Sequence, residues 1–426
     1  MRNHSRSTAL SLLVVTLTLS SQTHAAGDGW FAATNDTSVV LSNDSRGAAA
    51  RVLAELTMAR TVMTQVAQVE SKLPVRVFAV KDEASLRELV PQYWERRGVR
   101  PQAASYAGPY TAFIAVRADL PVPQRFPMLL HEYVHLLTAV QVPDAPAWLD
   151  EGLSEFWGSL VLDGNQVIVG RPRPGHLKLL RTRTWIPLND MLQQDRGTLG
   201  ADQSEVSMFY AQSWAMVHYL LLGRSATAPL AFAPADRQLD SQFETAIRRY
   251  VSDGRFREVA VASSAASGTP QLARPISEAR ALAERANMLV FGERLDAALP
   301  LARRALALEP QEPLALEVMG TYFFQRNEPA RAREWLDRAL AADPASYGTA
   351  LYLALLTSSP NERERYLTAA VRAKPDFTLA WQRLWAVYEE DGRAAHARRW
   401  CNRLSRLPLP WLWVDLSSYC GLQDQR

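Results

Sequence analysis

Two histidines in the chain have the spacing of a metal site on a helix. They occur in the segment His131-Glu132-Tyr133-Val134-His135. Because the two imidazoles are four residues apart, a helix places them on one face, one turn apart, where both can bind the same cation. Glu132 follows the first histidine and is placed to hydrogen-bond a metal-bound water and accept its proton. We therefore predict His131 and His135 as metal ligands and Glu132 as the general base.

A third ligand is required, because catalytic zinc is held by three protein ligands and keeps its fourth position for water or substrate. Soon after the histidine segment a second apolar helix begins and offers Glu151. The alternative reading is that Glu151 only stabilises the start of its helix. Glu155, one turn further, either accepts the free N–H of a ligand histidine or is a solvated charge. The prediction is a Zn²⁺ site made of His131, His135 and Glu151.

These motifs resemble those of the gluzincin metallopeptidases, the thermolysin and aminopeptidase N group, and in particular the peptidase MA-like domains often joined to tetratricopeptide repeats. The resemblance covers residues 75–223 and is carried by the histidine segment, by PAWLDEGL at 146–153 and by FYAQSWA at 209–215. It implies a gluzincin-like α+β domain with zinc on His131, His135 and Glu151 and with Glu132 as base. The methionine-containing signature of the exopeptidases is absent, so specificity for an N-terminal residue is not expected.

The resemblance also implies a side-chain donor for the oxyanion, a tyrosine or histidine downstream of the third ligand. Tyr210, in the FYAQSWA segment, is the predicted donor. Tyr219, His218 and Tyr133 are rivals, and a packed tyrosine that caps a backbone group is the alternative. His176 is expected to be a surface or packed residue.

Apolar spacing predicts the elements that must position these residues. It predicts helices over residues 45–69, 83–95, 124–140, 147–160, 203–222 and 242–250, and a strand over 75–80. A second strand, predicted over 110–116, resembles the edge strand on which gluzincins bind extended peptides by backbone pairing. The histidine segment falls inside the helix 124–140.

The C-terminal part of the sequence is repetitive. Pro310, Pro344 and Pro375 recur at a spacing close to the period of tetratricopeptide repeats, about 34 residues. In the best-fitting repeat the apolar and small positions are Leu316, Met319, Gly320, Phe323, Ala332, Leu336 and Ala339. The next repeat, between Pro344 and Pro375, is shorter, and we place the deletion near residues 358–361. Four helix pairs are expected, enough for an all-α solenoid that offers a protein partner a surface.

The remaining segments complete the predicted domain organisation. Residues 1–25 have a polar start with two arginines, a short apolar run and a small-residue end, which predicts a signal peptide and a periplasmic or secreted protein without stable membrane insertion. We then expect a peptidase domain over 26–262, a linker over 263–274, repeats over 275–410 and a capping tail over 411–426.

Charge and cysteine content exclude several classes of site. The chain has 47 Lys and Arg against 44 Asp and Glu, and the arginines are scattered without a nucleic-acid motif, so no nucleic-acid partner is expected. The only cysteines, Cys401 and Cys420, are far from the histidine segment, which disfavours a thiolate nucleophile or a cysteine-ligated zinc. We expect the two cysteines to be bridged, although two free thiols are about as compatible with the sequence.

Two functions from different classes follow. The first is an exported zinc peptidase that hydrolyses peptide or protein substrates and uses its repeats to contact proteins. The alternative is a catalytically inactive, peptidase-like scaffold that binds proteins through the repeats. The intact set of motif residues favours the first function.

Overall fold

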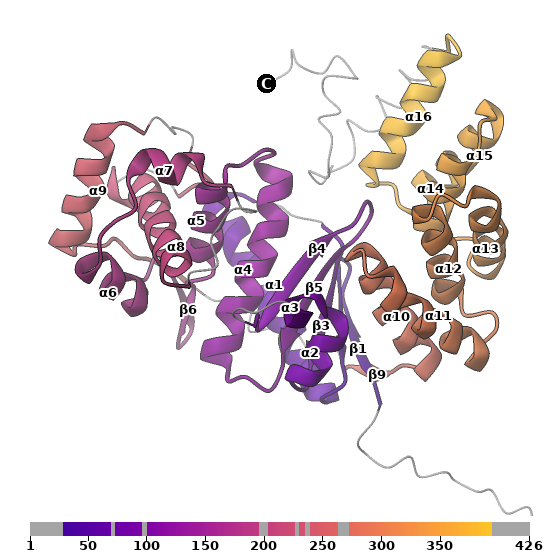
Figure 1. Cartoon of the computed structure of the whole chain (residues 1–426), viewed down its shortest axis with the longest axis horizontal. Coiled ribbons are helices and arrows are strands. Elements are labelled where there is room, and N and C mark those ends of the chain that lie inside the picture. The colour runs from indigo at the N-terminus through magenta and orange to yellow at the C-terminus, as the bar shows by residue number, and fades with distance from the viewer. Residues whose placement is uncertain are drawn as a thin grey trace, which may run out of the picture.

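The computed structural model describes residues 29–69, 73–95, 100–195, 203–225, 230–234, 239–262 and 272–393. The predicted signal peptide, both cysteines, most of the predicted linker and the capping tail lie outside these ranges. Within them an α+β body with two sheets is followed by a stack of helices (Figure 1). The predicted α+β class is confirmed.

The larger sheet has six strands in the order β4-β5-β3-β2-β1-β9. The strands are β1 (Phe31–Thr34), β2 (Ser38–Ser42), β3 (Val75–Val80), β4 (Ala103–Ala107), β5 (Ala112–Arg117) and β9 (Arg274–Pro275). Strands β2, β3 and β5 are parallel, and β4 pairs antiparallel with β5. The central strands β3 and β5 are mostly apolar, as expected for strands with both faces covered, and Arg76 of β3 is an exception.

The edge strand differs from the prediction. The strand predicted over 110–116 is β5, which pairs on one side with β3 and on the other with β4, so the expectation that it is the edge strand is wrong. Among the described strands the edge next to it is β4, and Tyr110 belongs to the β4–β5 turn. The sequence of β4, Ala-Ala-Ser-Tyr-Ala, is short and poor in β-branched residues, so its pattern does not predict a strand.

Helices cover both faces of this sheet. Helices α1 (Arg46–Ala67) and α4 (Val122–Gln141) pack on one face, where Val77 and Ile114 join the main core. Helices α2 (Glu83–Leu89) and α10 (Glu278–Phe291) pack on the other, where Phe78 and Ala115 meet Met288, and the short α3 (Gln92–Glu95) follows α2. Since α10 is the first helix of the C-terminal stack, the stack and the sheet share a core.

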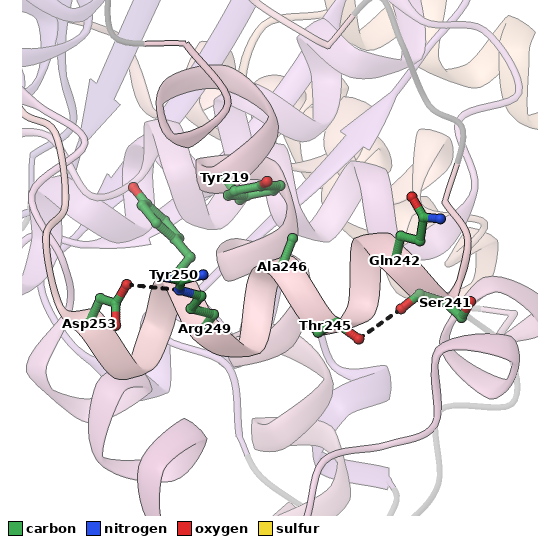
Figure 2. A pocket seen from close by; sticks show the side chains of 8 residues that line it. All are labelled: Tyr219, Ser241, Gln242, Thr245, Ala246, Arg249, Tyr250 and Asp253. Atoms are coloured by element: carbon green, nitrogen blue, oxygen red, sulfur yellow. Dashed lines mark hydrogen bonds and ion pairs between the residues drawn. The ribbon is translucent and has the colours of Figure 1, made fainter.

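A second lobe contains a three-stranded sheet and several helices (Figure 1). Its elements are α5 (Ala147–Trp157), β6 (Val161–Asp163), β7 (Gln166–Val169), α6 (Pro174–Thr182), α7 (Leu188–Gln193), α8 (Gln203–His218), α9 (Ser241–Asp253) and β8 (Val259–Ala262). The helix predicted over 203–222 is α8 continued by one π-helical turn, η2 (Tyr219–Gly223). On the outer side of this lobe, α9 and Tyr219 line a hollow of about 620 Å³ (Figure 2).

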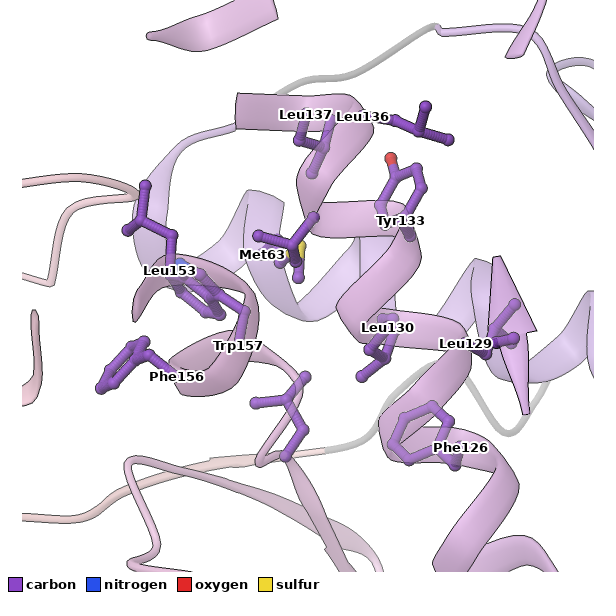
Figure 3. Packing of buried hydrophobic residues seen from close by; sticks show 14 of the residues in the cluster. Met63, Phe126, Leu129, Leu130, Tyr133, Leu136, Leu137, Leu153, Phe156 and Trp157 are labelled. Atoms are coloured by element: carbon purple, nitrogen blue, oxygen red, sulfur yellow. The ribbon is translucent and has the colours of Figure 1, made fainter. Parts of the chain in front are cut away.

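The two helices that carry the predicted ligands pack on each other and on the core. Helix α4 buries Phe126, Leu130, Tyr133 and Leu137, and α5 buries Leu153, Phe156 and Trp157 (Figure 3). The histidines of α4 lie off this apolar face and keep part of their surface exposed. Burial of the apolar faces therefore fixes how the ligand-bearing faces meet.

Gly152 lets α5 approach α8 closely. A Cβ atom at this position would lie 2.5 Å from the carbonyl oxygen of Ser213 and 2.6 Å from Cγ2 of Val217. We expect Gly152→Ala to lower the free energy of unfolding by about 1–3 kcal/mol, because the overlap outweighs the better helix propensity of alanine, about 1 kcal/mol. Urea unfolding measures this change. Gly175→Ala on α6 is the control, since no atom lies within 4 Å of its added Cβ; equal midpoints for the two variants would contradict the packing argument.

The C-terminal stack is built from consecutive helices packed in pairs. They are α10, α11 (Leu295–Leu308), α12 (Pro313–Gln325), α13 (Pro329–Ala342), α14 (Tyr347–Leu356), α15 (Pro360–Ala373) and α16 (Thr378–Glu390). All seven apolar or small positions predicted for the best-fitting repeat are buried, in α12 and α13. The repeat between Pro344 and Pro375 is shorter because helix α14 has 10 residues against 13 in α12. The inner turns after α12 and α14 have the same length, so the deletion lies in the first helix, and its predicted place in the inner turn near residues 358–361 is wrong.

The α+β body and the helix stack are less separate than the predicted linker suggests. Arg274, the last residue of the predicted linker, pairs with Ala32 in the large sheet. Arg76 of β3 forms an ion pair of 2.6 Å with the buried Glu284 of α10. The stack therefore begins as part of the body. No helix in the described part of the chain is both long and apolar enough to cross a membrane.

Candidate metal centre

Three predicted ligands meet at one point between α4 and α5. The Nε2 atoms of His131 and His135 are 3.0 Å apart. Oε2 of Glu151 lies 3.5 Å from each of these nitrogens. Among the described residues, these three form the group of His, Cys, Asp or Glu side chains that lie close enough together to hold a metal ion.

The outer nitrogen of each histidine is held by a carboxylate. Nδ1 of His135 lies 2.8 Å from Oδ2 of the buried Asp150 and 3.0 Å from Oγ of Ser154. Nδ1 of His131 lies 3.3 Å from Oε1 of Glu155. A carboxylate accepts hydrogen bonds, so each Nδ1 carries the proton and each Nε2 presents its lone pair.

The donor set fits a small divalent cation. Two lone pairs and one carboxylate oxygen converge, and Oε2 of Glu151 is buried without a hydrogen-bond donor among the described residues. Such a concentration of acceptors is repulsive unless a cation lies between them. Tetrahedral zinc with bonds of about 2.0–2.1 Å separates its ligand atoms by roughly 3.3 Å, and the observed separations are 3.0, 3.5 and 3.5 Å. The residues therefore fit zinc.

Glu132 lies beside this group and faces a cleft. The cleft has a volume of about 540 Å³, and its lining includes His131, Glu132, Glu155 and Tyr210. Oγ of Ser105, in strand β4, donates a hydrogen bond of 2.6 Å to Oε2 of Glu132. The edge strand thus contacts the predicted base directly.

Tyr210 lies beside the predicted ligands, and its rivals do not. Its ring centroid lies 6.2 Å from that of His131, and it lines the same cleft. Tyr133 is fully buried in the core on the opposite face of α4. Tyr219 lines the hollow over α9 (Figure 2), and His218 is fully buried against Gly170 and Tyr250. Among the four sequence-predicted candidates, Tyr210 alone lines the cleft beside the predicted ligands.

Glu155 is the centre of a charged network. Its Oε2 accepts from Nη1 of Arg173 at 2.6 Å and lies 2.8 Å from Nε2 of His176. Burial alone would raise the pKa of the Glu155 carboxyl, but His131, His176 and Arg173 outweigh burial and hold this pKa well below its usual value. Glu155 is therefore an anion that orients His131. His176 is a partner of Glu155 and not a member of the ligand group.

Sequence reasoning misses three site residues. Asp150 is not predicted as a site residue, yet its side chain contacts Nδ1 of His135. The sequence signal that could have indicated Asp150 is its position next to Glu151 and one helical turn before Ser154. Ser105 contacts Glu132, and Tyr93 lines the cleft. Both residues reach the site through tertiary contacts that no local sequence pattern reveals.

The comparisons with known proteins assign no function to these residues. No family model matches the chain, and no curated protein matches it. Among solved structures, the crystal structure of MamA protein aligns over 29% of this chain and 70% of that chain, with 19% sequence identity and a TM-score of 0.26. A likeness at this level carries no argument about the fold. The description of the helix stack is therefore based on the packing of its own helices.

His218 gives this lobe a pH-dependent stability. Burial lowers the pKa of His218 to about 4, although its bond to the Gly170 carbonyl opposes the shift. Because the pKa in the unfolded chain is higher, about 6.5, protonation favours unfolding. The contribution is complete above pH 6.5 and is lost as the pH falls towards 4, a loss of about 3 kcal/mol. Urea unfolding of wild type and His218→Gln across this window should show a steeper loss in wild type; parallel curves would contradict the assignment.

Proposed function

We propose that this chain is a zinc-dependent peptidase of the gluzincin type, which hydrolyses peptide bonds in peptide or protein substrates. One observation carries the proposal. Three acceptor atoms of His131, His135 and Glu151 converge within 3.5 Å of one another, while both outer ring nitrogens are bound to carboxylates. Glu132 stands next to that group on the wall of a cleft large enough for a peptide segment.

The proposed chemistry uses groups whose positions are known. Zinc, when bound by the three ligands, supplies a Lewis acid and an acidified water. Glu132 accepts the proton of the attacking water and later delivers it to the leaving amine. The hydroxyl of Tyr210 donates a hydrogen bond to the oxygen that gains negative charge. Asp150 and Glu155 keep His135 and His131 in the tautomer that binds metal.

An extended substrate has a place to pair. Strand β4 has no partner on its outer side among the described strands. Gln102 and Ala103, at its start, line the cleft, and Ser105 contacts Glu132. A peptide that adds to this edge by backbone hydrogen bonds would pass beside the metal centre.

The proposal extends to the helix stack and the location of the protein. Paired helices, with prolines that recur at about the 34-residue period of tetratricopeptide repeats, support such repeats, which commonly present a surface to another protein. The signal-like N-terminus supports an exported protein, periplasmic or secreted.

Hydrolysis of an unfolded protein tests the proposal. Purified protein should cleave reduced, denatured substrate, lose this activity after treatment with a metal chelator, and regain it when about one equivalent of zinc is added. A protein that holds zinc at this site but cleaves no substrate would favour the inactive scaffold. Cleavage that persists in the chelated protein would exclude a zinc mechanism.

A further inference from the structure

The turn between β4 and β5 inserts one side chain into the helix stack. The turn is closed by a hydrogen bond of 2.8 Å from the amide of Gly108 to the carbonyl of Thr111. Tyr110 leaves it and packs edge to face on Phe291, Tyr347 and Tyr352, at centroid distances of 5.6, 5.7 and 6.2 Å. These rings come from α10 and α14, the first helices of two different pairs.

The stack is shaped to receive this tyrosine. The hydroxyl of Tyr110 donates to Oε1 of Glu317 on α12, a side chain with 5% of its surface exposed. The other carboxylate oxygen of Glu317 accepts from Ser346 and Thr349, both at 2.6 Å. A Cβ on Gly348 would lie 2.7 Å from the Tyr110 ring, so the ring fits because position 348 has no side chain. Both oxygens of this buried carboxylate thus face donors, one of which comes from the body.

Strand β4 lies between the zinc-binding helix and the stack. On one face Ser105 bonds Glu132 of α4. On the other face Ala104 shares a core with Met288 of α10, and the Tyr106 ring packs beside Gly292, where an added Cβ would lie 3.1 Å away. The turn that Tyr110 anchors in the stack therefore follows directly on β4, the strand that borders the cleft. A strand with only one paired edge opens more readily than a central one, so an anchor at its end affects its order.

We propose that Tyr110 and Glu317 are positioning residues, through which the helix stack holds β4 in place for substrate pairing beside Glu132. The stack then serves the active site of its own chain, in addition to any protein partner. This inference rests on the proposed function for the role of β4 in substrate binding. The hold on β4 itself rests only on the contacts of Tyr110 and Glu317.

Hydrogen–deuterium exchange of the β4 amides tests the hold. Tyr110→Phe keeps the ring and removes one hydroxyl that donates to a glutamate. Tyr388→Phe is the matched control, because the Tyr388 hydroxyl donates to Glu364 at 3.0 Å in the same stack but away from the turn. Exchange at residues 103–107 should become about ten-fold faster in Tyr110→Phe, more so in Tyr110→Ala, and stay unchanged in Tyr388→Phe. Glu317→Gln, which keeps an acceptor oxygen, should retain most of the protection.

Kinetics test the consequence for substrate. With a long peptide, Tyr110→Phe should raise KM by about ten-fold and change kcat by less than about two-fold, with unchanged zinc content, because binding and not chemistry is affected. Unaltered exchange in both Tyr110 variants, or equal acceleration in Tyr110→Phe and Tyr388→Phe, would overturn the proposal. An absence of hydrolysis in wild type would count against the proposed function. It would not decide whether the stack holds β4, because the exchange measurement requires no substrate and tests that contact separately.

Discussion

A Glu132→Gln variant is expected to lose about 1,000-fold in kcat while keeping its zinc. The amide has nearly the shape of the carboxylate, but it cannot accept the proton of the attacking water. Glu132 is not a predicted ligand. It accepts a hydrogen bond from the hydroxyl of Ser105, and the amide oxygen of a glutamine can accept the same bond. The fold and the metal group should therefore remain intact. The measurement is the steady-state hydrolysis of a labelled peptide, together with zinc analysis of the same sample.

Glu205→Gln is the control for this variant. Glu205 is an exposed residue of α8 outside the cleft lining, so the same chemical change there should leave kcat within about two-fold of wild type, as expected for an exposed substitution away from the site. Residual activity of more than about a tenth of wild type in Glu132→Gln would remove Glu132 from the role of base.

Tyr210→Phe should lower kcat by about 100- to 1,000-fold without altering zinc content or unfolding. The change deletes only the hydroxyl, which donates to the charge that develops in the transition state, whereas the ring beside His131 is kept. Because the interaction exists only in the transition state, kcat and kcat/KM should fall together.

Tyr219→Phe serves as the control, since Tyr219 is on the helical continuation of α8 but lines the hollow over α9 (Figure 2). Its turnover should match wild type. A Tyr210→Phe enzyme with unchanged turnover would assign the role of donor to another group that lines the cleft. Tyr93 is the other tyrosine in that lining.

The ligand group is predictable from sequence because its geometry is local. His131 and His135 are one helical turn apart, and their helix is predicted as 124–140 against the observed Val122–Gln141. Glu151 follows from the spacing of the next helix. Glu155 is named from its helix position and Tyr210 from the family resemblance of its segment, and the structure brings both to His131.

Residues that reach the site through tertiary contacts are not predictable in the same way. Ser105 lies 27 positions before Glu132, in an alanine-rich strand that lacks the usual β-branched pattern. Glu317 is 207 positions from Tyr110, and an isolated glutamate in a repeat looks like an ordinary helix-surface charge. The edge strand is misassigned for the same reason: pairing order in a sheet depends on contacts that apolar spacing along one strand does not encode.

Metal analysis of the purified wild-type protein and of Glu151→Ala tests the central claim most directly. Wild type, loaded with zinc and dialysed, should hold about one zinc per chain. Glu151→Ala removes the carboxylate whose Oε2 lies 3.5 Å from both Nε2 atoms, so it should bind zinc at least about ten-fold more weakly in a chelator competition. A folded wild-type protein that retains no zinc, or a Glu151→Ala variant that binds zinc as tightly as wild type, would contradict the account.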